Sequence, residues 1–479
     1  MEREEEFEMI KDNILKRQYK FFTTVCIVVG FIVGTGIFWQ PGSVLAWVEG
    51  DMWWGVLAWV VGGVAIATCV YMFSVLASRY EKVHGMVDYA EAILGKRYGY
   101  LAGWFFAVMY QTAGYALIAW ITASFTATLA GHAQTRNTPF VFFLTAFYMA
   151  IVFALNYLAP KLPIRFNSAT VVIRVIPLVL MGTVGVVMAR FFNAPYPAAA
   201  ISETAANPIT RAGFMGAVFA TAFAYNGWQA AVAFNSEVND SKRKFPWALL
   251  LGFFIVMVLY VLYFIGVVSA GDPARIMAEN QLGTREAFAN IFGARASDIV
   301  MIFVIISGLG ILNMCCMGMS RGLYAIARRG RGPIPQRMVQ LDPHTGVPVC
   351  SMVTCVGISF LWLMVLYGNY NGWFRVNENL WLFHRFPVQG ETFFFRLQDF
   401  YNMFFFVLQI PMYIGFIIRH GKDQTINPFN RFIAPLLAIA GASLMLFSMV
   451  SSSIAHGIIY TLAFITLAII GMCFYPKRR

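Results

Sequence analysis

Charged residues are scarce in this sequence of 479 amino acids. Asp, Glu, Lys and Arg make up only 12% of it, and hydrophobic residues make up 59%. Ordinary globular chains contain about 25% charged residues. So little charge excludes a disordered chain, a coiled coil and a cytosolic enzyme. The composition instead predicts a polytopic membrane protein.

Motifs for catalysis and metal binding are also missing. The six histidines are scattered, with no HExxH pattern and no Cys–His spacing, and neither a phosphate loop nor a GxSxG elbow occurs. The sequence therefore predicts no catalytic residue, no metal and no cofactor. A membrane-embedded transferase or a transporter-fold sensor stays as an alternative of a different class. The sensor would normally add a soluble signalling domain, and we expect none here.

The cysteines do not form the pattern of an extracellular disulfide framework, because all of them lie in or beside apolar runs. We interpret them as free thiols that pack as small hydrophobic side chains. They are Cys26, Cys69, Cys315, Cys316, Cys350, Cys355 and Cys473. No cleavable signal peptide is expected, because residues 1–20 are amphipathic and acidic and the apolar run after them exceeds signal length.

Twelve apolar runs are long enough for membrane helices, which need about 20 residues each. They lie near residues 21–45, 53–78, 101–130, 139–158, 168–190, 212–234, 246–269, 297–319, 347–368, 397–419, 430–450 and 453–475. The last two are separated only by Ser451–Ser453, which indicates a tight turn. The sequence predicts an all-α integral membrane fold with twelve transmembrane helices.

The basic residues predict the orientation. An even number of spans places both termini on one side, and most of the 35 Lys and Arg residues fall in segments on that side. By the positive-inside rule both termini are cytoplasmic, and we expect a plasma-membrane protein. The same rule explains the net charge of +12 without a nucleic-acid partner. Residues 242–244 are a basic loop that faces anionic membrane lipids.

Glycine interrupts two of the spans. The first contains Gly34-Thr35-Gly36, and the sixth contains Asn226-Gly227. Mid-helix glycine costs up to about 1 kcal/mol, and membrane-buried backbone leaves the helix only where protein or a water-filled cavity satisfies its polar groups. Interrupted spans at corresponding positions of two halves indicate a transporter site. The alternative is that these glycines only allow close helix packing.

Spans one and six would each open one half of a 5+5 inverted repeat. We expect a first repeat over residues 21–190 (spans 1–5) and a second over 211–419 (spans 6–10). Spans 11 and 12, at 430–475, lie outside the repeat. A cytoplasmic N-terminus (1–20) and a cytoplasmic tail (476–479) flank these parts.

The free ends of such broken helices have complementary charge. Backbone N–H groups near Thr35 lie at a positive helix end, which suits a carboxylate. Backbone carbonyls near Ile32 and Val33, and those of Phe223, Ala224 and Asn226, would suit an ammonium group. Donors beside acceptors match a zwitterion, and an α-amino acid has that shape.

Four motifs carry a resemblance to a known family. They are Gly34-Thr35-Gly36-Ile37-Phe38 followed by Pro41-Gly42; Phe223–Trp228 followed by Glu237 and the basic loop from Lys242 to Pro246; Tyr89, Gly95, Gly99, Gly103 and Trp104; and Ser320-Arg321 with Ala327–Gly330. In this order they resemble the amino acid–polyamine–organocation (APC) superfamily over spans one to ten. Within it, the chain is most similar to the L-type amino acid transporters and their bacterial relatives.

This resemblance implies alternating access of a bundle against a scaffold, with substrate bound between spans one and six. It implies that the Thr35 and Gly36 amides hold the carboxylate and that Phe223 is an aromatic gate. The substrate-binding residues that we expect are Ile32, Gly34, Thr35, Gly36, Phe223, Ala224, Asn226 and Gly227. The cargo is expected to be a neutral L-amino acid, because no acidic partner for a cationic side chain stands out there.

Arg174 is the one charge well inside a predicted span. Many sodium-independent relatives carry a lysine here, so the resemblance implies that Arg174 replaces a sodium ion and ties span five to span one. The alternative is that its side chain reaches back to the cytoplasmic interface. Gln229 stands where some proton-linked relatives have glutamate. Both residues favour sodium-independent exchange or facilitated uptake; a proton- or sodium-coupled symporter stays as the alternative.

Further polar residues in the spans have two interpretations. Tyr110, Gln111, Thr112, Ser307 and Asn313 either line the cavity or form interhelical hydrogen bonds, and the second is the commoner role. We expect two others, Asp399 and Asn402, at the membrane interface.

The loop between spans three and four bears on protein partners. Eukaryotic L-type transporters bind a glycoprotein through a cysteine there. Residues 131–139 contain no cysteine, so no disulfide-linked heavy chain is expected. The sequence is compatible with a homo-oligomer.

Overall fold

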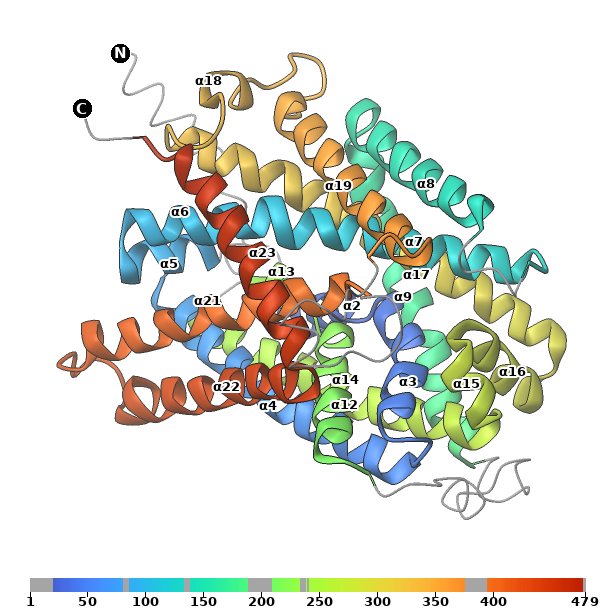
Figure 1. Ribbon diagram of the computed structural model, residues 1–479. Helices are drawn as coiled ribbons and strands as arrows, with labels where there is room; N and C mark the ends of the chain where they lie inside the picture. The colour runs from blue at the N-terminus through green and yellow to red at the C-terminus, as the bar shows by residue number, and fades with distance from the viewer. Residues whose placement is uncertain are drawn as a thin grey trace, which may run out of the picture.

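The computed structural model describes residues 20–80, 86–132, 138–187, 209–232, 238, 241–374 and 394–476. Over these ranges the chain forms helices and no β-strand (Figure 1). The first part contains α2 (Phe21–Ile32), α3 (Thr35–Trp47), α4 (Met52–Arg79), α5 (Met86–Leu94), α6 (Lys96–Trp104), η1 (Phe105–Tyr110), α7 (Gln111–Leu129), α8 (Pro139–Leu158), α9 (Lys161–Leu180) and η2 (Met181–Gly185).

The second part begins after residue 208. It contains α12 (Arg211–Ala224), α13 (Trp228–Val232), α14 (Ser241–Ala270), α15 (Pro273–Ala278), α16 (Asn280–Phe292), α17 (Ala294–Arg328), α18 (Pro335–Met338), α19 (Val349–Tyr370), α21 (Leu397–His420), η4 (Phe429–Ile433), α22 (Ala434–Ser452) and α23 (Ile454–Cys473). The turn expected at Ser451–Ser453 is there, between α22 and α23.

Nine helices in the described ranges are long and apolar enough to cross a membrane, and the bent pair α2–α3 adds a tenth if it counts as one span. The other two predicted spans coincide with shorter apolar helices, Val172–Gly185 and Arg211–Ala224. The all-helical, multi-pass membrane fold is therefore confirmed. The count of twelve and the inverted repeat stay predictions.

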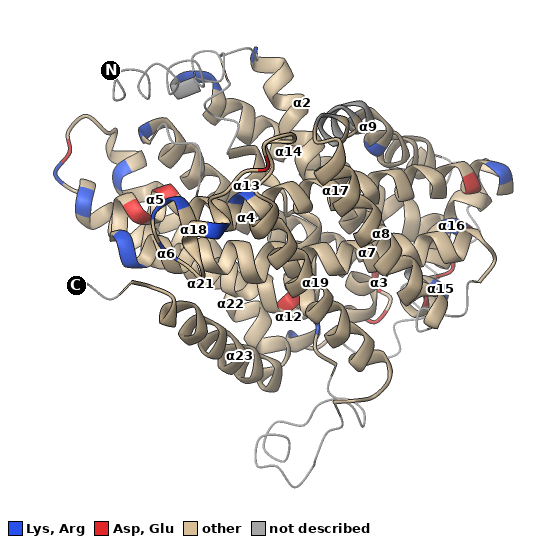
Figure 2. Cartoon of the chain, turned by 90° about the horizontal axis from the view of Figure 1, so that it is seen from above, with Lys and Arg blue, Asp and Glu red and all other residues tan. Residues whose placement is uncertain are grey.

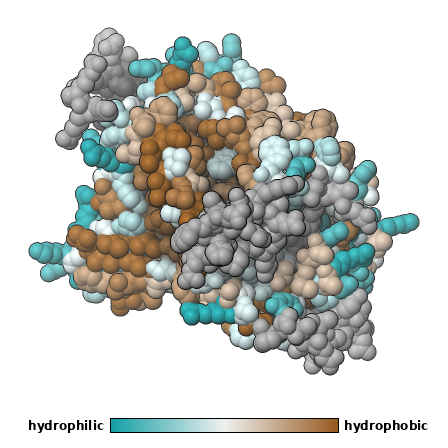
Figure 3. All heavy atoms as spheres, viewed as in Figure 1, coloured by the Kyte–Doolittle hydropathy of each residue, from teal (hydrophilic) through white to brown (hydrophobic). Residues whose placement is uncertain are grey.

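Charged residues mark the two ends of this helical bundle. They gather beside α5, α6 and α18 at one end and beside α15 and α16 at the other, with few in between (Figure 2). The surface between the ends carries a broad hydrophobic area (Figure 3). A chain that spans a membrane needs this distribution, because lipid does not solvate charge.

Local sequence sets several helix starts. Asp51 caps α4, since its carboxylate accepts hydrogen bonds from the backbone N–H groups of Trp53 and Trp54 at 2.8 and 3.1 Å. Thr210 caps α12 by accepting from Gly213 N at 3.0 Å. These caps satisfy N–H groups that a helix leaves without partners.

Residues 271–296, between the seventh and eighth predicted spans, fold largely into α15 and α16. Between the ninth and tenth predicted spans the sequence has several aromatic residues, which we expect to form a belt at the membrane interface. Trp373 among them is 59% exposed, and Trp381, Phe383 and Phe386 lie outside the described residues.

Candidate functional site

The first predicted interruption lies between α2 and α3. Helix α2 closes where Val33 N donates to Val29 O at 2.9 Å, Gly34 is extended, and α3 begins at Thr35. The two halves are bent by 53°. The first N–H groups of α3 consequently have no acceptor within their own helix.

The second interruption separates α12 from α13. Residues 225–227 form a turn, and a new helix begins as Ala230 N donates to Gly227 O at 3.0 Å. Gly227 has a φ of +109°, a conformation that glycine adopts at little cost. Both spans that the sequence singled out are thus broken near the residues that it named.

The two interruptions touch each other. A Cβ atom added to Gly36 would lie 3.1 Å from Ala224 Cα and 3.3 Å from Phe223 O. A Cβ atom added to Gly227 would lie 2.2 Å from Phe31 O. The backbone of each break therefore packs directly on the backbone of the other. Glycine is required for this approach at Gly227, while at Gly36 a side chain would be tightly crowded.

Helices α3 and α12 continue this contact as an antiparallel pair. At the far end of α3, Trp47 lies against Gly213 and Gly216 of α12. Midway, the Gln40 side chain is fully buried, and its Nε2 donates to Ala220 O. The half-helices that carry Thr35–Gly36 and Phe223–Ala224 are thus held side by side. We call this contact the α3–α12 seam.

Two carbonyls at the end of α2 accept hydrogen bonds from other spans. Ile32 O, one of the predicted ammonium ligands, accepts from the Tyr260 hydroxyl of α14 at 3.1 Å. Gly30 O accepts from Arg174 at 3.1 Å. A carbonyl oxygen has two lone pairs, so Ile32 O retains capacity for a second donor.

Uncharged polar side chains surround the second break. Asn226 Nδ2 donates to Asn402 Oδ1 at 2.6 Å, and Gln229 Nε2 donates to Asn226 Oδ1 at 3.3 Å and to the Tyr110 hydroxyl at 3.4 Å. Gln229 Oε1 accepts from Gly227 N at 2.8 Å. Asn402 was expected at the membrane interface, but it is 1% exposed and bonded to the site. Tyr110 is the last residue of the π-helical turn η1. Turns of this kind are frequent at functional sites.

Most of the predicted site is shielded from solvent. Thr35 is 1% exposed, Ala224 2% and Phe223 7%. Two other site residues, Gly36 and Asn226, are only partly buried. The structure therefore places the residues predicted to recognise the carboxylate and the ammonium group next to each other in the interior, at the end of α2, the start of α3 and the end of α12.

Arg174 is fully buried in α9 and connects three helices. It donates to Gly30 O of α2 at 3.1 Å and to Thr170 Oγ1 at 3.1 Å. A Cβ atom added to Gly310 of α17 would lie 1.9 Å from Arg174 Nη2. The side chain thus ties the fifth predicted span to the first, and its burial argues against the alternative in which it reaches back to the interface.

Some predicted polar residues form interhelical hydrogen bonds instead. Thr112 Oγ1 accepts from Trp362 Nε1 at 3.2 Å, and Asn313 Oδ1 accepts from Asn156 Nδ2 at 2.6 Å. Ser307 is fully buried. Among the described residues, no group of three His, Cys, Asp or Glu side chains is arranged to hold a metal ion.

A helical membrane protein whose two interrupted helices meet in the interior belongs to the class of transporters built on discontinuous helices. A profile of the family described as amino acid permease matches residues 19–474. The chain therefore belongs to the amino acid permease family, and this confirms the resemblance to the APC superfamily.

Curated relatives are similar over most of the chain. The serine/threonine exchanger SteT of Bacillus subtilis is 23% identical and covers 91% of this chain and 92% of its own length. The large neutral amino acids transporter small subunit 2 of Rattus norvegicus is 25% identical, covering 79% of this chain and 70% of its own. The mouse b(0,+)-type amino acid transporter 1 is 25% identical, covering 67% and 65%. These proteins are transporters and not enzymes, so the transferase alternative is set aside.

Proposed function

We propose that this permease moves a neutral L-amino acid across the membrane by alternating access. The Thr35 and Gly36 amides would bind the carboxylate, and the carbonyls of Ile32, Phe223, Ala224 and Asn226 would bind the ammonium group. Gly34 and Gly227 would shape the backbone around the substrate. The observation that carries this proposal is the direct contact of the two interrupted helices at Gly36 and Gly227.

Physical chemistry supports the assignment of a zwitterion. The start of α3 presents unbonded N–H groups and a partial positive charge, while the ends of α2 and α12 present carbonyls and a partial negative charge. The start of α3 is in backbone contact with the end of α12, and the turn after α12 is in contact with the end of α2. Groups this close could bind the two charges of one α-amino acid. Phe223 adjoins Gly36 and would serve as the gate over the bound substrate.

The surroundings support a neutral cargo. Asn402, Gln229 and Tyr110, which bond to the second break or to one another, are all uncharged. A cationic side chain would need a carboxylate partner, because a buried unpaired charge is costly.

Sodium-independent exchange is the mode that we favour. Arg174 fixes a positive charge against the broken end of α2, which would replace the charge of a coupling ion. The relative SteT is named an exchanger. Proton- or sodium-coupled symport by the same fold is the alternative, and a transporter-fold sensor is the alternative of a different class.

We also propose the arrangement in the membrane. The chain would cross twelve times, with an inverted repeat of residues 21–190 and 211–419, both termini cytoplasmic and the protein in the plasma membrane. The breaks in α2–α3 and α12–α13 support the repeat, since each would lie in the first span of its half.

Counterflow in proteoliposomes tests the function. Vesicles are loaded with one unlabelled neutral amino acid, and each labelled amino acid is offered outside in turn. We expect label to accumulate only for neutral amino acids, and only when the vesicles are preloaded. No accumulation with any amino acid would contradict transport, whereas equal uptake into empty vesicles would contradict exchange.

A further inference from the structure

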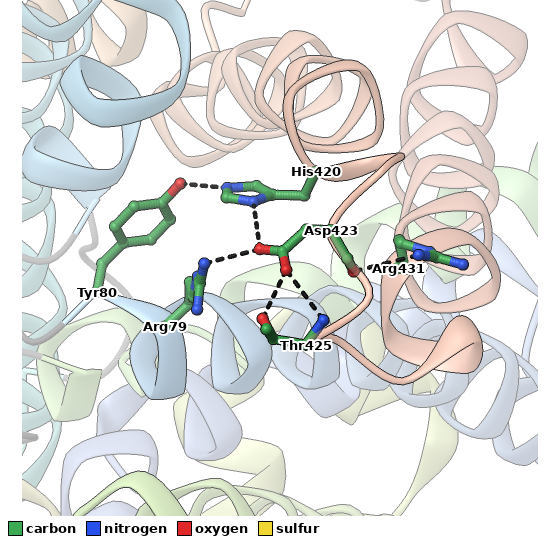
Figure 4. Close-up of polar contacts among 6 residues, drawn as sticks. All are labelled: Arg79, Tyr80, His420, Asp423, Thr425 and Arg431. Carbon is green, nitrogen blue, oxygen red and sulfur yellow. Dashed lines mark hydrogen bonds and ion pairs between the residues drawn. The ribbon is translucent and has the colours of Figure 1, made fainter.

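The connection between α21 and α22 meets the end of α4 around one carboxylate, Asp423 (Figure 4). Asp423 Oδ2 accepts from Arg79 Nη2 at 2.7 Å, and Oδ1 accepts from the backbone and hydroxyl of Thr425 at 3.0 and 2.6 Å. Asp423 O accepts from Arg431 Nη1 at 3.1 Å. One short loop therefore positions guanidinium groups that come from two distant parts of the chain.

Positive charge is in excess here. Among the described residues 79–80 and 419–431, four are cationic and one, Asp423, is acidic. Arg79 contacts the Asp423 carboxylate, Arg431 its backbone carbonyl, and Arg419 the carbonyl of Ala92, while Lys422 precedes Asp423 in the chain. We call Arg79, Arg419, Lys422, Asp423 and Arg431 the Asp423 cluster. Hydrogen bonds from Thr425 and the charge of Arg79 lower the pKa of Asp423, so the carboxylate is ionised at neutral pH and the excess persists.

His420 and Tyr80 complete the packing without adding an acid. The Tyr80 hydroxyl and His420 Nε2 are 2.7 Å apart, and His420 Nδ1 lies 3.5 Å from Asp423 Oδ2. Neither contact brings a second carboxylate to the cluster.

Another basic group at the same end of the molecule is neutralised by acids. Arg329 pairs with Asp88, and Arg331 Nη2 lies 3.4 Å from Glu91. Arg331 is only 8% exposed. Those ion pairs fasten α5 to the end of α17. In the Asp423 cluster, by contrast, Arg79 keeps 43% of its side chain exposed, and Lys422 is exposed as well.

Apolar side chains lie directly beside this charge. In the last two turns of α21, Ile414 and Ile418 are 44% and 79% exposed. In η4, Phe429 and Ile433 are 41% and 47% exposed. Each pair is spaced by four residues and so shares one helix face. Helices α4, α21 and α22 are long and apolar enough to cross a membrane. If they do so, the exposed apolar residues near their ends would face hydrocarbon, and the cluster would lie at headgroup depth.

We propose that the Asp423 cluster binds the phosphate headgroup of an anionic membrane phospholipid, whose acyl chains lie along Ile414, Ile418, Phe429 and Ile433. Guanidinium groups bind phosphate oxygens through paired hydrogen bonds, and basic pockets between membrane helices recognise anionic lipids. Asp423 would neutralise one of the four positive charges and would orient Arg79 and Arg431. This inference does not depend on the transported substrate.

Lipid retention tests the proposal directly. The protein is placed in nanodiscs of phosphatidylcholine with a minor fraction of phosphatidylglycerol, and bound lipids are counted by native mass spectrometry. The double variant Lys422→Gln/Arg431→Gln should retain phosphatidylglycerol roughly tenfold more weakly or worse. The matched control Lys96→Gln/Arg337→Gln removes the same charge from exposed positions at the same end and should retain it normally.

Two results would overturn the inference. An equal loss in both double variants would mean that long-range attraction alone gathers the lipid. In detergent, a rise in melting temperature with inorganic phosphate alone, absent in the cluster variant, would identify a free anion as the ligand. Melting curves without lipid check that both variants are folded.

Discussion

A close neighbour occupies the space where a side chain would lie at three glycines, Gly36, Gly227 and Gly310. The neighbour is different at each. At Gly36 the neighbour is the backbone of α12, and at Gly227 it is Phe31 O, combined with a positive φ. At Gly310 it is the guanidinium of Arg174. The sequence indicated the first two through their position in interrupted spans. It did not indicate Gly310, because its partner lies far away in the chain.

Substitution of Gly36 tests whether transport depends on the close approach of the two helix breaks, apart from any effect on folding. Gly36→Val should abolish amino acid exchange, because the added methyls would meet Phe223 and Ala224 and push the two breaks apart. Overpacking of this kind costs about 1–3 kcal/mol, which such a protein can survive. Counterflow measures the exchange activity, and size-exclusion chromatography checks that the variant is folded. Gly357→Val is the control, since nothing lies within 4 Å of its added Cβ. Normal exchange by Gly36→Val would contradict the site.

The α3–α12 seam aligns the two parts of the proposed site, the carboxylate ligands and the carbonyls. One half-helix supplies the proposed carboxylate ligands and the other supplies carbonyls, so their relative position sets the distance between the two charges of the site. Gln40 is the polar contact midway along the seam, and its removal should therefore affect substrate recognition more than folding.

Gln40→Met keeps the volume of the side chain and removes the donor to Ala220 O. A hydrogen bond of this kind contributes about 1 kcal/mol, so we expect KM for the amino acid to rise about two- to tenfold, with a smaller change in maximal rate. Initial rates of exchange at graded substrate concentrations measure both. Gln340→Met, at an exposed position, should leave both constants unchanged. A fall in maximal rate alone would remove Gln40 from this positioning role.

The elements of the fold were largely predictable from the sequence. Apolar runs of about 20 residues have one physical explanation in a chain this hydrophobic, and glycine inside two of them marked the breaks. The partners around the breaks were not predictable. Asn402 and Tyr260 reach the site from other helices, and only helix packing decides which polar side chain of a span points inward.

The buried cation Arg174 connects the two predicted halves of the molecule. Arg174 joins α9 and α2 of the first predicted half and lies against Gly310 of α17 in the second. In the proposed mechanism, a permanent charge at this place would make a coupling ion unnecessary. The sequence showed the charge within a span, but the direction of its side chain required the fold.

Replacing sodium with choline on both sides of proteoliposomes should leave the rate of exchange unchanged. Arg174→Met keeps a long side chain without charge, and we expect it to lose most exchange because Gly30 O loses its donor. Labelled amino acid uptake measures both effects. Strong sodium dependence of the unchanged protein would favour the symporter alternative, and an active Arg174→Met variant would show that the charge is dispensable.

The break between α2 and α3 also constrains biosynthesis. The two pieces have 12 and 13 residues, or about 18 and 20 Å of helix, whereas the hydrocarbon layer is about 30 Å thick. Neither piece can cross alone, so the ribosome-bound chain must deliver both to the bilayer as one insertion unit. Because α12 packs on the bend at Gly36, the bend gains this packing only when α12, which is translated much later, has also been inserted.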